Sequence, residues 1–260
     1  MSLGTGDDWR PWVAERAGEF SAAVAFLTRI PFARRSAVSG AALAPAVWAF
    51  PLAGVIVGGI GAVVYALTHR VGLSPWAAAA LAVAAILALT GALHEDGLAD
   101  TVDGFGGGAT RQEKLDIMRD ARIGTYGVCA LSLSLLIRVG AVASLADAGA
   151  VAAALIAAHA AARAAMPAVM FWLPAARSDG LSFAAGRPPG VSTAVAALLG
   201  FLTLAFCLGF GRALAALAVV AVAVFLVAQL SRRQIDGQTG DVLGAVEQAG
   251  EILVLLVAVG

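Results

Sequence analysis

Charge is scarce in this sequence. Only 13% of its 260 residues are Asp, Glu, Lys or Arg, about half the share of an average soluble domain, whereas 60% are hydrophobic. This composition excludes an ordinary soluble protein. The 17 basic residues balance the 17 acidic ones, so the chain also lacks the positive excess typical of nucleic-acid-binding proteins. We therefore expect no nucleic acid partner.

Cysteine is scarce, and the sequence predicts no signal peptide. Cys129 and Cys207 both lie in apolar runs, which favours buried thiols over a disulfide or a metal pair. Asp7 and Asp8 interrupt the first residues, so no apolar core of a signal peptide follows Met1. Apolar residues instead recur at near-helical spacing over residues 11–30, with charged residues between them. This pattern predicts an interfacial amphipathic helix lying on a lipid membrane.

Long apolar runs dominate the rest of the chain. A helix needs about 20 apolar residues to cross the hydrocarbon core, because unpaired backbone amides are too costly in lipid. The sequence thus predicts an all-α fold, a polytopic transmembrane helix bundle with about seven spans, within a range of six to eight. We expect residues 1–260 to form a single integral-membrane domain. The seven runs are 43–67, 73–93, 126–146, 149–172, 191–211, 213–230 and 241–259.

The basic residues predict the orientation of these spans. Loops rich in Lys and Arg stay in the cytoplasm, and a cytoplasmic N-terminus places 13 of the 17 basic residues on that side. We therefore expect a multi-pass protein of the bacterial inner membrane with its active site on the cytoplasmic side. Three cytoplasmic segments are long or polar enough to carry function: 94–125, 173–190 and 231–240.

The most informative segment, His94–Gly104, is acidic. If it is helical, Asp96, Asp100 and Asp103 share one face, with Glu95 beside them. Two carboxylates about 6 Å apart repel by roughly 3 kcal/mol at an effective dielectric constant of about 20, so such a group needs protons or cations. These four residues are the predicted ligands of Mg²⁺, with Mn²⁺ as a substitute.

A solvated acidic loop is the alternative interpretation of this segment. It is disfavoured because no Lys or Arg between residues 94 and 110 relieves the repulsion. Positive charge returns just downstream, at Arg119 and Arg122. Metal and guanidinium groups together can neutralise a pyrophosphate during phosphoryl transfer, so these arginines are predicted to bind a diphosphate.

Two further groups are candidates for the site. His159 and Arg163 lie four residues apart in the fourth span, where a charge costs at least about 2.5 kcal/mol, so both are candidates for lining a polar cavity. Arg138 is a more isolated example. Asp241 begins the last span and is a predicted contributor to the metal or substrate site, whereas the roles of Glu247 and Glu251 stay open.

With these residues in view, the chain resembles the cobalamin synthase family, the adenosylcobinamide-GDP ribazoletransferases or cobalamin-5'-phosphate synthases. The resemblance rests on the motifs Phe26–Pro31, His94–Gly104, Met118–Gly127 and Thr239–Ala245. It implies that a ribose hydroxyl of alpha-ribazole, or of its 5'-phosphate, attacks the cobinamide-linked phosphorus of adenosylcobinamide-GDP. GMP leaves, and Mg²⁺ is required.

The resemblance and the residue patterns together assign roles. The predicted catalytic residues are Asp96, Asp100, Asp103, Arg122 and His159. The predicted substrate-binding residues are Arg29, Arg119, Arg122, Arg163 and Asp241. One carboxylate near the metal is expected to accept the proton of the attacking hydroxyl. The choice between alpha-ribazole and its phosphate stays open, as does the oligomeric state.

Two other functions compete with this interpretation. Asp96–Ala99 begins like the motif of CDP-alcohol phosphotransferases, but Asp100 stands where that family has Arg. An ion-coupled transporter would also carry intramembrane residues such as His159, Arg138 and Arg163. Its polar residues should be distributed across the whole membrane thickness, whereas here the acidic residues crowd the predicted cytoplasmic side.

Overall fold

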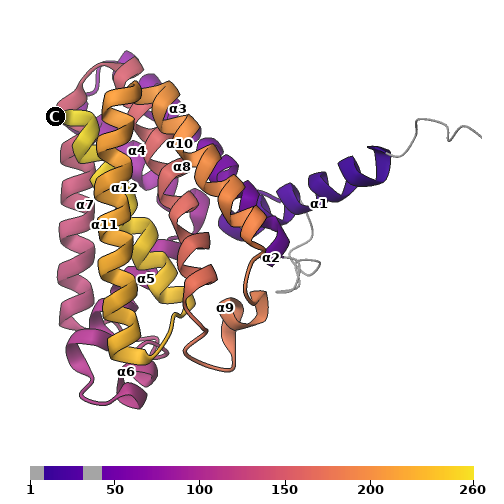
Figure 1. Ribbon diagram of the computed structural model, residues 1–260. Helices are drawn as coiled ribbons and strands as arrows, with labels where there is room; N and C mark the ends of the chain where they lie inside the picture. Colours follow the sequence, from indigo (N-terminus) through magenta and orange to yellow (C-terminus); the bar gives the residue numbers. More distant parts are fainter. Residues whose placement is uncertain (1–8, 32–42) are drawn as a thin grey trace, which may run out of the picture.

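The protein is an all-helical bundle in a computed structural model that describes residues 9–31 and 43–260 (Figure 1). In the described ranges, the only β-type pairing is an isolated parallel bridge between Ala175 and Gln238. The elements are α1 (Trp9–Leu27), α2 (Leu43–Ala46), η3 (Val47–Ala49), α3 (Phe50–Arg70), α4 (Pro75–Thr90), α5 (Leu93–Gly107), α6 (Arg111–Ile117), α7 (Thr125–Leu145), α8 (Ala148–Trp172), α9 (Gly180–Ala185), α10 (Gly190–Leu208), α11 (Phe210–Ile235) and α12 (Gly240–Val259).

The expected membrane spans are present as helices. Six helical stretches in the described residues are long and apolar enough to cross a bilayer: Leu43–Arg70, α7, α8, α10, α11 and α12. A seventh candidate is the pair α4 and α5, which passes the same criterion only together. The predicted all-α transmembrane bundle with about seven spans is confirmed, whereas its orientation stays a prediction.

A sharp bend between α4 and α5 sets the direction of the acidic helix. The two axes differ by 88° at a break of two residues. Gly91 and Ala92 both adopt left-handed backbone conformations, with φ of 70° and 56°, which ends α4 and redirects the chain. The backbone amide of Arg29 donates to the carbonyl of Leu89 at 2.7 Å, which holds the end of α1 against this bend.

Small residues allow the helices at the centre to pack closely. Gly54 and Gly58 lie one turn apart on α3, where a Cβ atom would collide with the backbone of His159 and Leu155 in α8. Close backbone approach of this kind is how transmembrane helices associate where lipid is as apolar as the side chains. The glycines thus place α3 directly against α8.

Helix α1 projects sideways from the bundle (Figure 1). Its first half is exposed, including Trp9 and Trp12, and its second half is buried against the bundle. The indole nitrogen of Trp48 donates to the buried carboxylate of Glu19 at 2.5 Å, and Arg16 pairs with the same carboxylate at 2.8 Å. The predicted helix is therefore present, and its position in the membrane interface stays a prediction.

The α3 and α8 contact makes a testable prediction. Gly58→Ala should lower the free energy of unfolding of the purified protein by about 1 to 3 kcal/mol, because the added methyl group collides with the Leu155 backbone. Gly59→Ala is the matched control, since its Cβ would have no neighbour within 4 Å. Thermal unfolding in detergent measures both variants. Equal melting temperatures would show that the two helices can separate without loss.

Candidate active site

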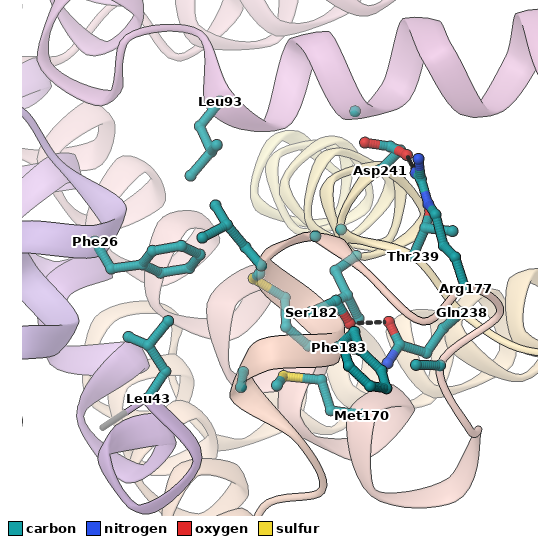
Figure 2. A pocket seen from close by; sticks show the side chains of 18 of the residues that line it. Phe26, Leu43, Leu93, Met170, Arg177, Ser182, Phe183, Gln238, Thr239 and Asp241 are labelled. Carbon is teal, nitrogen blue, oxygen red and sulfur yellow. Dashed lines mark hydrogen bonds and ion pairs between the residues drawn. The ribbon is translucent and has the colours of Figure 1, made fainter. Parts of the chain in front are cut away.

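A cavity of about 250 Å³ lies where the three polar segments meet. Its walls come from the start of α5, from the stretch between α8 and α9 with α9 itself, and from the start of α12 (Figure 2). Phe26 of α1 and Leu43 of α2 close one side. Segments that are far apart in the sequence therefore build one chamber.

Short loop contacts hold the second and third segments together. The amide of Ala176 donates to the carbonyl of Gln238 at 2.8 Å, and the amide of Gln238 donates to the carbonyl of Pro174 at 2.8 Å. The hydroxyl of Ser182 donates to the side-chain carbonyl of Gln238 at 2.6 Å, as Figure 2 shows. Arg111 donates to the Ile235 carbonyl at 3.0 Å. These bonds hold the loop before α9 and the loop before α12 together at the cavity wall.

Two glycines let the acidic helix approach α12. A Cβ on Gly97 would lie 2.8 Å from the carbonyl oxygen of Asp241, and one on Gly244 would lie 3.0 Å from that of His94. Neither distance leaves room for a side chain, so the crossing requires glycine on both helices. The crossing brings Asp96 and Asp241 to the same cavity.

The polar end of the cavity holds carboxylates and one guanidinium. Arg177 forms an ion pair with Asp241, whose Oδ2 also accepts from the hydroxyl of Thr239 at 3.0 Å (Figure 2). Asp100, one turn after Asp96, lies within electrostatic range of both Asp96 and Asp241. Asp96 and Asp241 thus line the cavity with Asp100 close enough to interact with both, and Arg177 is the guanidinium paired among them; this excess of negative charge favours a bound cation.

The structure separates the other two predicted metal ligands from this end. Asp103 accepts hydrogen bonds from the backbone amides of Gly124 and Gly127, at 2.7 and 2.8 Å. It therefore caps the first turn of α7, where a negative charge is also favoured by the helix dipole. Glu95 points into the bundle and pairs with Arg138 at 2.9 Å. Glu95 and Asp103 contact protein groups, and their roles as metal ligands stay predictions.

Glu95 belongs to a cluster of buried polar side chains that we call the buried ion network. Its members are His94, Glu95, Arg138, His159, Arg163, Glu247, Gln248 and Glu251, each at most 5% exposed. Arg138 contacts Glu95 and also Glu251, at 3.2 Å. Arg163 pairs with Glu247 at 2.5 Å. The network joins α5, α7, α8 and α12.

Histidines complete this network. His159 lies 3.6 Å from Glu251 through Nε2, and its Nδ1 is 3.1 Å from the guanidinium of Arg163. An arginine can only donate, so Nδ1 of His159 accepts from Arg163, while Nε2 lies toward Glu251. His94 reaches both Glu247 and the cavity wall. The expected catalytic role of His159 and substrate-binding role of Arg163 stay predictions, because both side chains lie behind the cavity wall.

The predicted cytoplasmic arginines lie at different distances from the cavity. Arg119 donates to both oxygens of Asp179, at 2.6 and 2.7 Å, and Asp179 lines the cavity. Arg122 instead binds Asp120 and holds the pKa of that exposed carboxyl at about 2. Arg29 lies over Gly91 at the bend between α4 and α5. Of the three, only Arg119 contacts a cavity residue directly through its side chain in the described structure.

Sequence reasoning missed the cavity roles of Arg177, Ser182 and Gln238. The signal was present, since the segments 173–190 and 231–240 were already distinguished by their polarity. What it lacked was the pairing of Arg177 with Asp241, which depends on how two loops meet. Glu247 and Glu251 were noted, but their arginine partners lie on other helices.

The donor atoms set limits on how a metal could bind. Within residues 9–31 and 43–260, one group of three potential ligands has its donor atoms within 4.8 Å of one another: His159, Glu247 and Glu251. This group is already engaged by two arginines. At the polar end, Asp96, Asp100 and Asp241 offer hard oxygen atoms but form no such group. They suit Mg²⁺ bound by one or two carboxylates, with substrate phosphate oxygens as further ligands.

The cap on α7 can be tested separately from any metal role. Asp103→Ala should lower the free energy of unfolding by about 1 to 2 kcal/mol, because two amides of α7 lose their acceptor. Asp116→Ala, which removes an exposed carboxylate from α6, should leave stability unchanged. Thermal unfolding in detergent compares the two. Identical melting curves would show that Asp103 does not hold the start of α7.

Comparison with known proteins covers nearly the whole chain. A family model described as cobalamin-5-phosphate synthase matches residues 19–259. A protein of Bradyrhizobium diazoefficiens named adenosylcobinamide-GDP ribazoletransferase is 54% identical over 236 residues, which is 91% of each chain. A protein of the same name from Mesorhizobium japonicum is 51% identical over 234 residues, 90% of this chain and 89% of the relative.

A third relative of that name, from Azorhizobium caulinodans, is 46% identical over 247 residues, covering 92% of this chain and 94% of its own. No solved structure matches. The family model spans the acidic helix, the loop of Arg177 and the start of α12, which are the three parts that build the cavity. This chain therefore belongs to the cobalamin-5-phosphate synthase family.

Proposed function

We propose that this protein is an adenosylcobinamide-GDP ribazoletransferase. It transfers the cobinamide phosphate of adenosylcobinamide-GDP to a hydroxyl of alpha-ribazole, or of alpha-ribazole 5'-phosphate, and releases GMP. The names of its relatives support this activity. The observation that carries it is the cavity in which Asp96, Asp241 and Arg177 meet, because a diphosphate donor needs oxygen ligands for a cation beside a guanidinium.

The carboxylates of the polar end are the proposed Mg²⁺ ligands. Asp96 and Asp241 line the cavity, and Asp100 lies one helical turn behind them. When bound, Mg²⁺ (or Mn²⁺ in its place) would neutralise charge on the diphosphate and on the departing GMP. The carboxylates also provide the proton acceptor for the attacking hydroxyl, and Asp96 is exposed on the cavity side of α5.

Arginines supply the second part of diphosphate recognition. Arg177 is partly buried and is held by Asp241, so its guanidinium is oriented before the substrate arrives. A planar guanidinium can bind two phosphate oxygens at once, which fixes the phosphorus for in-line attack. Arg119 stands at the rim, paired with Asp179, and its guanidinium is a second candidate for contact with phosphate. The hydroxyl of alpha-ribazole then meets a positioned phosphorus.

The site is proposed to face the cytoplasm of the bacterial inner membrane. The basic residues of α6 and of the loop after α9 occur with the cavity segments at one end of the bundle, and Figure 1 shows α6 and α9 at its lower end. Basic loops are retained on the cytoplasmic side during insertion. A nucleotide donor and a nucleotide product are both cytoplasmic solutes, which supports the same orientation.

Neutralising the proposed metal ligands should abolish turnover. Asp100→Asn and Asp241→Asn should each reduce GMP release by at least about a hundredfold, because the remaining carboxylates would hold Mg²⁺ too weakly to neutralise the diphosphate. Asp116→Asn removes an exposed carboxylate outside the cavity and should retain activity. The assay follows GMP from adenosylcobinamide-GDP and alpha-ribazole phosphate, with Mg²⁺ and then with excess chelator. Full activity in both variants, or turnover in chelator, would remove the proposed metal role.

The arginine of the cavity can be tested by its geometry. Arg177→Lys keeps the charge but loses two-point contact with phosphate, so KM for adenosylcobinamide-GDP should rise by about tenfold or more. Arg187→Lys is the control, since Arg187 lies over the ring of Phe171, outside the cavity. Steady-state kinetics with each substrate varied in turn gives the comparison. A change confined to KM for alpha-ribazole phosphate would place Arg177 on the acceptor instead.

A further inference from the structure

The cavity has two chemically different ends. Asp241 and Arg177 lie on one side, and Phe26, Leu43 and Leu93 lie on the opposite side (Figure 2). The side chains of Phe50 and Met166 also line the cavity and add to its apolar surface. The polar end accounts for a diphosphate and a cation. The apolar end has no part in that chemistry and is available to a different ligand group.

An aromatic pair marks this apolar end. The rings of Phe26 and Phe50 stack with their centroids 6.2 Å apart and their planes 25° from parallel. Phe50 is buried at 1% exposure, whereas Phe26 is only partly buried and reaches the cavity wall. Planar aromatic molecules bind well against such a surface because ring stacking adds to the burial of apolar area.

The two substrates differ in what they could place there. Guanine carries several hydrogen-bond donors and acceptors on its edge, and leaving them unpaired among Phe and Leu side chains would weaken binding strongly. The corrin ring is far larger than a cavity of about 250 Å³. The benzimidazole base of alpha-ribazole is flat, small and almost wholly apolar, with two methyl groups and one free ring nitrogen.

We propose that the apolar end formed by Phe26, Leu43, Phe50 and Leu93 is the binding subsite for the benzimidazole base of alpha-ribazole. This inference rests on the proposed function and assigns one substrate to one part of the cavity. With the base against Phe26, the ribose extends toward Asp96 and Asp241. The guanosine and corrinoid parts of the donor then lie beyond the polar end, outside the chamber.

Nearby polar groups suit the sugar that follows the base. Ser182 and Gln238 are hydrogen-bonded to each other in the cavity wall between the two ends, and both are nearly buried. The Ser182 hydroxyl retains acceptor capacity and the Gln238 amide retains donors. They can therefore contact ribose hydroxyls without disturbing the apolar end.

The test substitutes the aromatic wall with a polar side chain. Phe26→Gln should raise KM for alpha-ribazole by about tenfold or more and leave KM for adenosylcobinamide-GDP unchanged. The matched control is Phe105→Gln. Phe105 is also partly buried, but it lies near the C-terminal end of α5 and does not line the cavity. Phe26→Leu keeps the site apolar and should restore most of the affinity.

A binding measurement on the unaltered protein complements the kinetics. Free 5,6-dimethylbenzimidazole, which has no ribose or phosphate, should compete with alpha-ribazole for the purified full-length protein in detergent, and guanosine should not. If guanosine displaces alpha-ribazole and dimethylbenzimidazole does not, the proposed subsite is wrong. A rise in the donor's KM alone for Phe26→Gln would overturn it as well.

These measurements distinguish a failure of the proposed subsite from a failure of the proposed function. If no GMP is released under any condition but dimethylbenzimidazole still competes and Phe26→Gln still weakens alpha-ribazole binding, the subsite stands and the proposed function fails. If GMP release is normal and KM for alpha-ribazole is the same in Phe26→Gln and the unaltered protein, the function stands and the subsite fails.

Discussion

The buried ion network is the constraint on which the rest of this structure depends. Two guanidinium groups and three carboxylates lie at most 5% exposed inside a bundle surrounded by lipid. An unpaired charge in such a place is strongly destabilising, so each member must keep its partner. Since the partners come from α5, α7, α8 and α12, these four helices have one mutual arrangement that satisfies all of them.

This arrangement also explains how neighbouring residues of one helix take opposite roles. Consecutive positions on an α-helix point about 100° apart. Glu95 therefore enters the network while Asp96 faces the cavity, and Asp103, two turns later, reaches the start of α7. An acidic segment that looks uniform in sequence is divided by geometry into an internal ion pair, a cavity wall and a helix cap.

Much of this was predictable from the sequence, because hydrophobic run length and helical spacing are local properties. The spans and the helical acidic segment follow from such patterns, and so does the proposal that Asp96, Asp100 and Asp241 belong to the site. The partners of Glu95, Asp103 and Arg177 do not, since each is more than 20 residues away and depends on how distant helices and loops meet. The 88° bend could not be predicted from the sequence either, because a glycine such as Gly91 is equally typical of an ordinary helix end.

The glycines at the crossing of α5 and α12 determine how closely the two helices approach each other. Gly97 and Gly244 bring two backbones together so that carboxylates from different helices share one cavity. A carboxylate placed by backbone contact has less freedom than one at the end of a long loop. Positioning of this kind favours binding a cation and a diphosphate in one fixed geometry.

Phe26 gives α1 a part in the cavity, although most of the helix lies away from it. The helix projects from the bundle and exposes Trp9 and Trp12, yet its last turns supply one wall of the cavity. Any force that tilts α1 therefore changes the shape of the chamber. With α1 in the membrane interface as predicted, the lateral pressure, thickness and headgroup composition of the lipid would act on the proposed acceptor site, and a micelle, which applies none of these in the same way, would present a differently shaped chamber.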